Sequence, residues 1–427
     1  MKVIKMLNPN IEYRSDRKFT TGTIGDFFRI RLNKKNLALA NLLARMQMNA
    51  TASFPSISQQ QEVLSKFYDM SFEVVPQIMG PEIIMSYVTN FVEPVEVLDP
   101  EYTYKNIYKT FEKMAHHPLI NEEILELSKK QLEDEYREVM EEPSSYALDK
   151  FFKIWYQDRP DYEDTFMGDI NLIKDLTLKE VLTFSRSIRI APGAKLGVMK
   201  SANSIEMLVR KNNNLDFAGI IRAFDMDEIV NIPAGPQEGI YEEENHGNLQ
   251  AQVYLGYGYR EGRDEKFIHV KDIETEYQKR LVGLILSEYL AGDQSSKLFT
   301  SIREELGAAY QVNANSYHRN SLFLINTGID PDQIDEVIKI IKDEVEKVKK
   351  GDIDIDLLKK SKKSLINFRL IAQDRENWQL ANLLRQEMFS GYGRIDDDYM
   401  DVIKDINPKM LADFANDLFL KESYVLK

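Results

Sequence analysis

The segment IKDLTLKEVLTF (173–184) recurs further along the chain as IKDINPKMLADF (403–414). Two weaker similarities keep the same order at nearly the same offset, namely SKKQL (128–132) with SKKSL (361–365) and SKFYDMSFEV (65–74) with SIREELGAAYQV (301–312). Each match alone is short enough to arise by chance, but three at nearly one offset indicate an internal duplication. We therefore predict two related halves, 1–214 and 215–427, separated at the polar, turn-forming cluster Asn212–Asn214.

Each predicted half contains the same order of elements. An extended segment rich in aromatic and β-branched residues comes first, FFRIRL (27–32) in one half and QVYLGYGY (252–259) in the other. A helix with apolar residues at three- and four-residue spacing follows, at 36–48 and at 272–291. A hairpin and several amphipathic helices complete each half. Strands grouped before helices, twice over, predict an α+β protein of two homologous sandwich domains, each a mainly antiparallel sheet covered by helices.

The composition excludes several classes of function. The chain has 427 residues and a net charge of −14, which argues against a nucleic-acid binder because phosphate contacts need clustered cations. It has no cysteine, so disulfide frameworks, thiolate zinc sites, iron–sulfur clusters and thiol nucleophiles are excluded. The N-terminal MKVIKMLNPN has no apolar signal region, and no apolar run approaches the roughly 18 residues of a membrane span. We expect a cytoplasmic protein that binds neither nucleic acid nor membranes.

Only five histidines are available as metal ligands or general bases, and none has a second histidine at the i, i+4 spacing of a helical metal site. His116 and His117 precede Pro118, which predicts a helix C-terminus where the dipole favours imidazoles; a zinc site there is the weaker alternative. Gly256 and Gly258 loosely resemble a dinucleotide motif but lack its spacing and the helix that should follow. We therefore expect no metal in this chain.

The segment SSKLFTSIREELGAAYQV (295–312) is the most informative remaining stretch. It predicts a short helix that is ended by Gly307 and followed by a strand carrying Tyr310. Leu298 and Ile302 belong to the inner face of that helix, and Arg303 lies in its last turn, where a cation suits the dipole. From the residues alone, Arg303 and Tyr310 are better explained as parts of the fold than as functional residues.

This segment closely resembles the second-domain signature S-S-x-L-F-x-x-x-R-E-x-x-G-x-A-Y-x-V of the pitrilysin/insulinase-like metallopeptidases, the inverzincins. The matching residues are Ser295, Ser296, Leu298, Phe299, Arg303, Glu304, Gly307, Ala309, Tyr310 and Val312. The stretch HPLINEEILELSKKQLEDEYREV (117–139) also resembles the helices in the middle of the family's first domain. The resemblance implies the same two duplicated α+β domains that the internal repeat predicts.

The chain departs from the family at the zinc motif. Active members carry H-x-x-E-H on the first helix of the first domain, where two histidines bind zinc and the glutamate activates water, and a later glutamate is the third ligand. Aligning LALANLLARMQMNAT (37–51) with that region places Asn41, Ala44 and Arg45 at the three chemical positions. None of these side chains can bind zinc or accept a proton from metal-bound water. The resemblance therefore implies that this chain holds no zinc and has no catalytic residue of its own in isolation.

In heteromeric members of the family, one chain supplies H-x-x-E-H and the other supplies an arginine and a tyrosine. Arg303 and Tyr310 match that pair, with the phenol as a donor to the oxyanion and the guanidinium as a substrate-binding group. The resemblance thus implies the non-zinc subunit of a zinc peptidase for short or unfolded peptides, with a similar-length partner chain that binds Zn. Without that partner, a homodimer is the expected alternative assembly.

A function of a different class stays open at this point. Duplicated domains of this kind also serve as non-catalytic scaffold or peptide-binding subunits, in which Arg303 and Tyr310 would be dispensable. The net charge of −14 favours basic peptides as substrates, although a solvated acidic surface accounts for it equally well.

Overall fold

A computed structural model describes residues 10–164, 167–216, 224–226, 228–233, 238–244, 250–259, 267–306, 311–389 and 392–427. It divides into two compact units, each assembled from three separate segments of the chain. Unit 1 comprises Met1–Arg137, Phe166–Asp227 and Gln373–Gly393, and unit 2 comprises Glu138–Thr165, Glu228–Ala372 and Arg394–Lys427. The units are therefore not continuous stretches of chain, as the predicted halves 1–214 and 215–427 are.

Unit 1 is built on a five-stranded sheet in the order β1-β5-β2-β4-β3, in which β1 and β5 are parallel and the other neighbours antiparallel. The strands are β1 (Asn10–Ser15), β2 (Thr21–Arg31), β3 (Glu73–Met79), β4 (Glu82–Val92) and β5 (Gly193–Met199). The helices that begin in its segments are α1 (Lys34–Asn49), α2 (Ile57–Lys66), α3 (Tyr104–His116), α4 (Glu122–Glu141), α6 (Ile170–Asp175), α7 (Leu178–Ile188), α8 (Ala202–Asp216), α13 (Glu376–Met388) and α14 (Tyr392–Asp397).

Unit 2 has a five-stranded sheet in the order β7-β12-β8-β11-β10, in which β7 and β12 are parallel and the other neighbours antiparallel. The strands are β7 (Gly239–Glu243), β8 (Ala251–Tyr259), β10 (Val312–Tyr317), β11 (Leu322–Ile329) and β12 (Leu418–Leu426), and a separate ribbon pairs β6 (Ile229–Asn231) with β9 (Ile268–Val270). Its helices are α5 (Pro143–Trp155), α9 (Ile273–Ala291), α10 (Lys297–Leu306), α11 (Ile334–Lys349), α12 (Ile355–Ala372), α15 (Tyr399–Asp405) and α16 (Pro408–Asp417).

The two sheets have the same topology, strand for strand, and this confirms the predicted α+β fold of two homologous sandwiches. The strongest sequence repeat falls on equivalent elements, with 173–184 running from α6 into α7 and 403–414 from α15 into α16. Both repeats begin their second helix at a side-chain cap. Thr177 accepts from the backbone N–H of Glu180, and Asn407 accepts from that of Met410, so a polar cap at the same point starts each helix.

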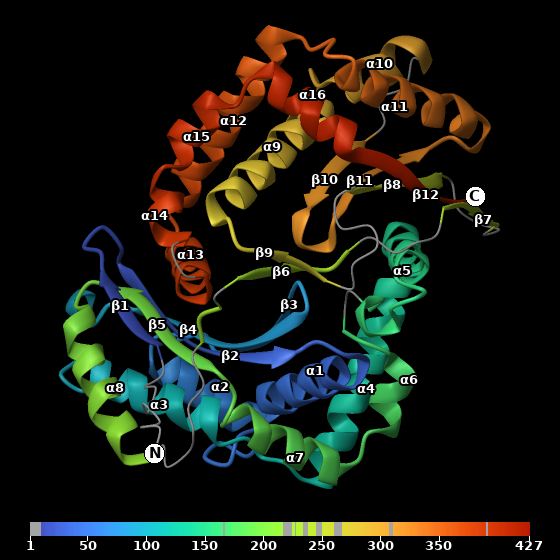
Figure 1. Ribbon diagram of the computed structural model, residues 1–427. Helices are drawn as coiled ribbons and strands as arrows, with labels where there is room; N and C mark the ends of the chain where they lie inside the picture. The colour runs from blue at the N-terminus through green and yellow to red at the C-terminus, as the bar shows by residue number, and fades with distance from the viewer. Residues whose placement is uncertain are drawn as a thin grey trace, which may run out of the picture. The chain divides into compact units, whose positions relative to one another are not determined.

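The two halves of the chain exchange one helix each. Helix α13, from the second half, packs on β2 and β5 of unit 1, whereas α5, from the first half, packs on β8 and β12 of unit 2 (Figure 1). A Cβ at Gly256 would lie 2.6 Å from the Phe151 ring and 2.7 Å from the Trp155 ring, so only glycine lets α5 approach β8 this closely. The close packing of α5 against β8 therefore explains Gly256, one of the two glycines that loosely resemble a dinucleotide motif.

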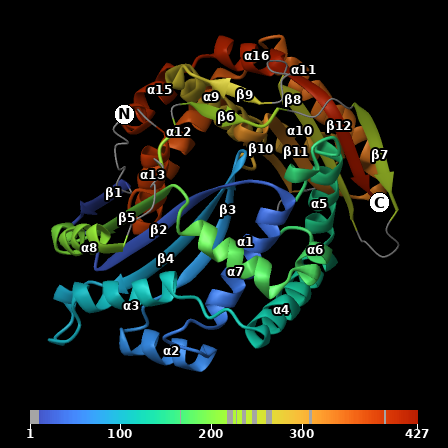
Figure 2. The same cartoon turned by 60° about the horizontal axis from the view of Figure 1, so that its bottom comes forward.

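Figure 2 shows the helix-covered face of the sheet in unit 1, with α1 and α3 beneath the strands.

The predicted turn at Asn212–Asn214 is wrong, because α8 continues through these residues to Asp216. One boundary between the two units falls at Asp227 and Glu228, beyond this cluster, and the predicted domain boundary at 214 stays a prediction. Within the described residues, no helix is long and apolar enough to cross a membrane.

Candidate functional site

Helix α1 carries the three positions at which the zinc motif is expected. Asn33 caps its N-terminus, and Ala44 is buried at 4% exposure. The Asn41 amide donates to the backbone oxygen of Leu37 at 3.0 Å. The Arg45 guanidinium forms an ion pair with Glu135 of α4. Asn41 is thus engaged within α1, and Arg45 links α1 to α4. No group of three or more potential metal ligands occurs in the described part of the chain.

Helix α10 carries the first part of the signature segment. Leu298 and Ile302 are buried, as their spacing predicts, and Arg303 is exposed with its guanidinium 5.9 Å from the ring centre of Phe299. Tyr310 lies outside the described residues, and so does Gly307. The pairing of Arg303 with Tyr310 therefore stays a prediction.

The two serines of the signature build the turn that precedes α10. Ser295 Oγ donates to Asp293 Oδ1 at 2.7 Å, and Ser296 Oγ donates to the backbone oxygen of Asp293 at 2.6 Å. Hydrogen bonds from Lys360 and Ser295 lower the pKa of Asp293 to about 2. These residues fix where α10 begins, which gives Ser295 and Ser296 a structural role.

A buried ionic cluster lies in unit 1. Asp26 of β2 is fully buried, and its Oδ2 lies 2.5 Å from Lys195 Nζ of β5 and 2.6 Å from His116 Nε2 at the end of α3. Burial raises the pKa of Asp26, but the Lys195 ammonium and the His116 imidazole outweigh burial and hold the pKa below its ordinary value. His116 does end a helix, as predicted, but its ring also pairs with a carboxylate that is 90 residues away in the chain.

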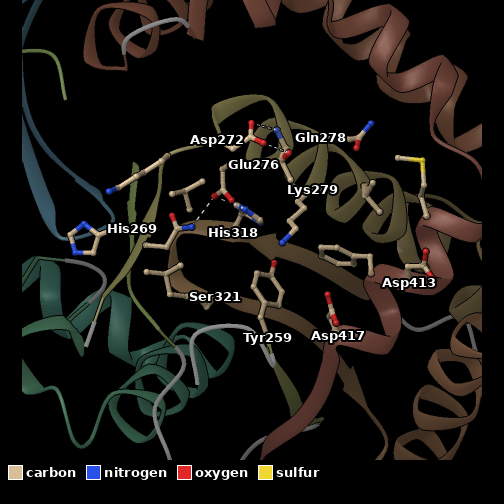
Figure 3. Close-up of a pocket in the computed structure, with 18 residues that line it drawn as sticks. Tyr259, His269, Asp272, Glu276, Gln278, Lys279, His318, Ser321, Asp413 and Asp417 are labelled. Atoms are coloured by element: carbon tan, nitrogen blue, oxygen red, sulfur yellow. Dashed lines mark hydrogen bonds and ion pairs between the residues drawn. The ribbon is translucent and has the colours of Figure 1, made fainter. Parts of the chain in front are cut away.

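A cavity of about 430 Å³ lies in unit 2, bounded by the β6–β9 ribbon, the first turns of α9, the end of β8 and helix α16 (Figure 3). At one end Glu276 Oε1 accepts from Asn231 Nδ2 at 2.8 Å and lies 2.7 Å from His318 Nε2. Burial raises the pKa of Glu276, but the hydrogen bond and charge of His318 and the hydrogen bond from Asn231 together lower it. The carboxylate is therefore ionised and serves as the centre of a polar group that β6, α9 and the turn before β11 supply.

Asn231 Oδ1, His318 Nδ1 and Ser321 Oγ, all buried at this end of the cavity, have no hydrogen-bond partner among the described residues, and His318 Nε2 has only its ion-pair contact with Glu276. The exposed fractions of Asn231, His318 and Ser321 are only 4%, 9% and 1%. A buried polar atom without a partner costs about 1–3 kcal/mol. Ser321 is also one of few described non-glycine residues with positive φ, at 48°. Unpaired atoms and an unusual backbone therefore coincide beside an open space.

The rest of the cavity lining is aromatic and acidic. The Tyr259 ring lies 5.6 Å from the ring centres of both His318 and Phe414, so it spans the floor between the polar end and α16. Asp413 and Asp417 lie on α16, on the far side of Tyr259 from His318 (Figure 3). The cavity combines an imidazole paired with a carboxylate, an aromatic floor and several polar side chains, and no metal-ligating cluster occurs among the described residues.

Glu422 is a second feature that the sequence does not reveal. It is 3% exposed on β12, opposite Gly256 of β8, and its Oε1 has no hydrogen-bond partner within the described chain. Burial raises the pKa of Glu422 to about 9, although the neighbouring Lys421 partly opposes this. The carboxyl is therefore protonated at neutral pH. In the run FLKESYVL nothing distinguishes a buried glutamate from an exposed one.

Comparison with known proteins gives the family. Residues 231–365 match the sequence family described as the peptidase M16 inactive domain. This part of the chain therefore resembles the peptidase M16 family. The uncharacterized zinc protease YmxG of Bacillus subtilis is similar to this chain at 23% identity over 158 residues, which are 36% of the chain and 38% of that protein. An uncharacterized zinc protease of Streptomyces coelicolor is 20% identical over 314 residues, 70% of this chain and 63% of that protein.

These alignments span less than two thirds of either relative's length. Solved structures match the chain over nearly its full length. A conserved protein from Enterococcus faecalis V583 gives a TM-score of 0.79 at 17% identity, covering 98% of this chain and 96% of that one. A peptidase M16 inactive domain from Pseudomonas fluorescens gives 0.77 at 15% identity, covering 98% and 95%. At these identities the likeness shows the fold.

The M16 match begins at Asn231 and therefore includes part of the cavity. Glu276, His318 and Ser321 lie within the matched residues, as does Arg303. Helix α16, which supplies Asp413 and Asp417, lies beyond them. Sequence reasoning treated His318 as isolated because its partner, Glu276, is 42 residues away and no motif links the two. No local signal marks this cavity in the sequence.

Proposed function

We propose that this chain is the non-zinc subunit of a cytoplasmic heteromeric metallopeptidase that cleaves short or unfolded peptides. A partner of similar length with H-x-x-E-H would bind Zn, and this chain would supply Arg303 and Tyr310. One observation carries the proposal. The sequence keeps the arginine and tyrosine of the signature, while the zinc-motif positions hold Asn41, Ala44 and Arg45.

The contacts of α1 support the same assignment. Asn41 donates to its own helix and Arg45 pairs with Glu135, so both side chains are engaged in the fold of unit 1. An amide that is hydrogen-bonded to a backbone carbonyl and a guanidinium that is paired with a carboxylate cannot act as zinc ligands. Water activation in this scheme therefore belongs to the partner's metal.

The roles of Arg303 and Tyr310 follow from the charges that develop in peptide hydrolysis. Attack of water on a peptide carbonyl produces a tetrahedral oxyanion, and a phenol O–H can donate to that oxygen. A guanidinium can hold a substrate carbonyl or carboxylate through paired N–H donors. The exposure of Arg303 on α10 leaves its guanidinium accessible for such a contact.

Co-expression with a candidate H-x-x-E-H chain tests the proposal. We expect the isolated chain to be inactive and the mixed enzyme to cleave an unfolded peptide. Arg303→Ala and Tyr310→Phe should each lower kcat/KM of the mixed enzyme by at least about tenfold, as expected for loss of a transition-state or substrate contact. Arg186→Ala, at an exposed arginine of α7, is the matched control and should leave activity unchanged. Full activity of both signature variants would refute the assigned roles.

A non-catalytic scaffold or peptide-binding role is the second candidate. The observation that favours it is that the zinc-motif positions on α1 hold residues committed to fold contacts. In that case the chain would bind peptides or partners stably, and Arg303→Ala and Tyr310→Phe would change neither binding nor the activity of any complex. Size-exclusion chromatography with light scattering, with and without the partner, would also distinguish a heterodimer from a homodimer.

A further inference from the structure

We propose that the cavity of unit 2 binds a guanidinium group, such as the side chain of a peptide arginine. This goes beyond the proposed function, because binding requires neither zinc nor a partner chain. The site consists of the unpartnered polar end formed by Asn231, His318 and Ser321, the aromatic floor at Tyr259, and the acidic side on α16.

The unpartnered atoms indicate a ligand that donates hydrogen bonds. Asn231 Nδ2 donates to Glu276, which leaves Asn231 Oδ1 as an acceptor directed away from that bond. The Ser321 hydroxyl, which also has no partner among the described residues, can accept as well. A ligand with several N–H groups would satisfy both oxygen atoms at once.

The charge of the lining favours a cation. Four carboxylates line the cavity against two lysines, and the residues concerned are Asp272, Glu276, Asp413, Asp417, Lys271 and Lys279. The N-terminus of α9 also borders the cavity and would by itself attract an anion. Asp272 already caps it, however, accepting from Thr275 N at 3.1 Å and from Thr275 Oγ1 at 2.7 Å. The helix dipole is thus offset by the protein's own carboxylate.

The shape and walls favour guanidinium over ammonium. A guanidinium is planar and has five N–H donors in a fixed fork, so it can reach acceptors on separate residues, whereas an ammonium is a compact point charge. The Tyr259 and Phe414 rings pack edge to face, with centres 5.6 Å apart and planes inclined at 69°. Aromatic faces bind guanidinium by cation–π contact, and they pack against an aliphatic stem. Buried Val282 adds a further apolar wall for that stem.

The neighbouring ion pair does not by itself explain the arrangement. Glu276 and His318 need only each other and Asn231 Nδ2 to be paired, and an apolar residue at 321 would avoid a buried hydroxyl that has no partner among the described residues. Ser321 is moreover held at φ 48°, a conformation in which glycine or asparagine is the easier choice. The protein keeps a hydroxyl at this position although the backbone favours glycine.

Calorimetric titration of the full chain tests the proposal directly. The probes are the N-acetyl amides of arginine, citrulline and lysine, because citrulline keeps the arginine shape but is neutral. We expect the arginine compound to bind at least about tenfold more tightly than citrulline and several-fold more tightly than lysine. Free L-arginine forms a separate arm. Tighter binding of the blocked amide would identify a peptide side chain as the natural occupant, and tighter binding of L-arginine the free amino acid.

Variants locate the binding site. Asn231→Ala and Ser321→Gly should each weaken the arginine compound by at least about fivefold, and Asp413→Asn with Asp417→Asn should weaken it similarly. Ser321→Gly removes the hydroxyl with a residue that suits positive φ, so the fold is expected to survive. Asn315→Ala, at an exposed position of β10 outside the cavity, is the matched control and should bind like the wild type.

Two outcomes would overturn the proposal. One is equal affinity for the arginine and citrulline compounds, or no binding of either at millimolar concentration. The other is wild-type affinity in both Asn231→Ala and Ser321→Gly, with thermal unfolding showing that both variants are folded. Neither result depends on peptidase activity, so failure here leaves the Arg303 and Tyr310 assignment untouched.

Discussion

Each unit pairs a buried carboxylate with a histidine, but the two pairs differ in their surroundings. In unit 1, Asp26 contacts both Lys195 and His116, so one anion faces two potential cations. In unit 2, Glu276 contacts His318 and the Asn231 amide at the wall of a cavity, next to polar atoms that have no partner among the described residues. The first arrangement neutralises charge within the fold, whereas the second leaves hydrogen-bonding capacity for something else.

This difference distinguishes buried polar groups that serve stability from those that serve binding. A paired buried charge is costly to break because removing one partner strands the other. A polar group beside a cavity is open to water or ligand, so its loss should cost less stability and more affinity. The unit 1 cluster should therefore respond to mutation mainly in unfolding experiments, and the unit 2 cavity mainly in binding experiments.

The largest effect is expected at Lys195. Lys195→Met leaves Asp26 buried with only His116 as a partner, and should lower the free energy of unfolding by about 3–5 kcal/mol. Urea titration measures the change. Lys179→Met, at an exposed lysine of α7, is the control and should stay within about 0.5 kcal/mol of the wild type. A loss at Lys195 no larger than at Lys179 would show that the unit 1 cluster contributes nothing to stability.

Substitution of Glu422 should give the next largest change in the free energy of unfolding, in this case an increase. The folded pKa of Glu422, about 9, exceeds the ordinary value of 4.5, so between these values the folded state holds a proton that the unfolded state releases. Stability therefore falls as the pH rises through that range. Glu422→Gln should stabilise the protein at pH 8 by on the order of 2 kcal/mol and flatten the pH dependence. Thermal unfolding at several pH values checks both; a destabilised variant would contradict burial of a neutral carboxyl.

Glu276→Gln should cost less than Lys195→Met, about 1 kcal/mol, because glutamine can still accept from Asn231 and the cavity can admit water. Because the pKa of Glu276 is lowered in the folded state, the wild type loses the stabilisation from the ionised carboxylate as the pH falls below 4.5. Glutamine does not titrate, so the stability of the variant should depend less on pH in that acidic range. Glu274→Gln, on the exposed side of α9, is the control. A loss as large as that of Lys195→Met would erase the contrast between the two units.

The smallest stability effect is expected for Ser321→Gly. Relief of the positive φ should offset the added freedom of glycine in the unfolded chain, so unfolding should change by less than about 1 kcal/mol. Guanidine titration alongside the wild type measures this. Strong destabilisation of the variant would show that the Ser321 hydroxyl stabilises the fold. A loss of arginine affinity in Ser321→Gly could then be explained by that destabilisation.

The elements of the fold were predictable because their signals are local. Aromatic and β-branched runs marked β2 and β8, and three- and four-residue apolar spacing marked α1 and α9. The exchange of α5 and α13 was not predictable, because an amphipathic pattern shows that a helix has a buried face but not which sheet covers it. The turn expected at Asn212–Asn214 failed because asparagine is only a weak helix breaker, and α8 tolerates three in a row.

The candidate sites divide in the same way. Arg303 could be found because it belongs to a contiguous signature, and Asn41, Ala44 and Arg45 because they replace one. The unit 2 cavity could not, because Asn231, Glu276 and Ser321 come from separate segments and none is unusual in its own stretch. Its decisive property, polar atoms without partners, exists only once those segments are folded together.

The exchange of α5 and α13 also constrains the order in which the chain can fold during synthesis. Unit 1 lacks one of its covering helices until residues 373–393 have left the ribosome, after the unit 2 segment 228–372 has been made. Unit 2 in turn needs β12, at Leu418–Leu426. Domains generally fold as they emerge during synthesis, which proceeds at about 5–20 residues per second. Here, each sheet keeps an apolar face uncovered until its later segment has been made. Co-translational folding therefore cannot finish the first half before the second, and a nascent chain that stalls between α8 and α13 would expose that face to chaperones and proteases.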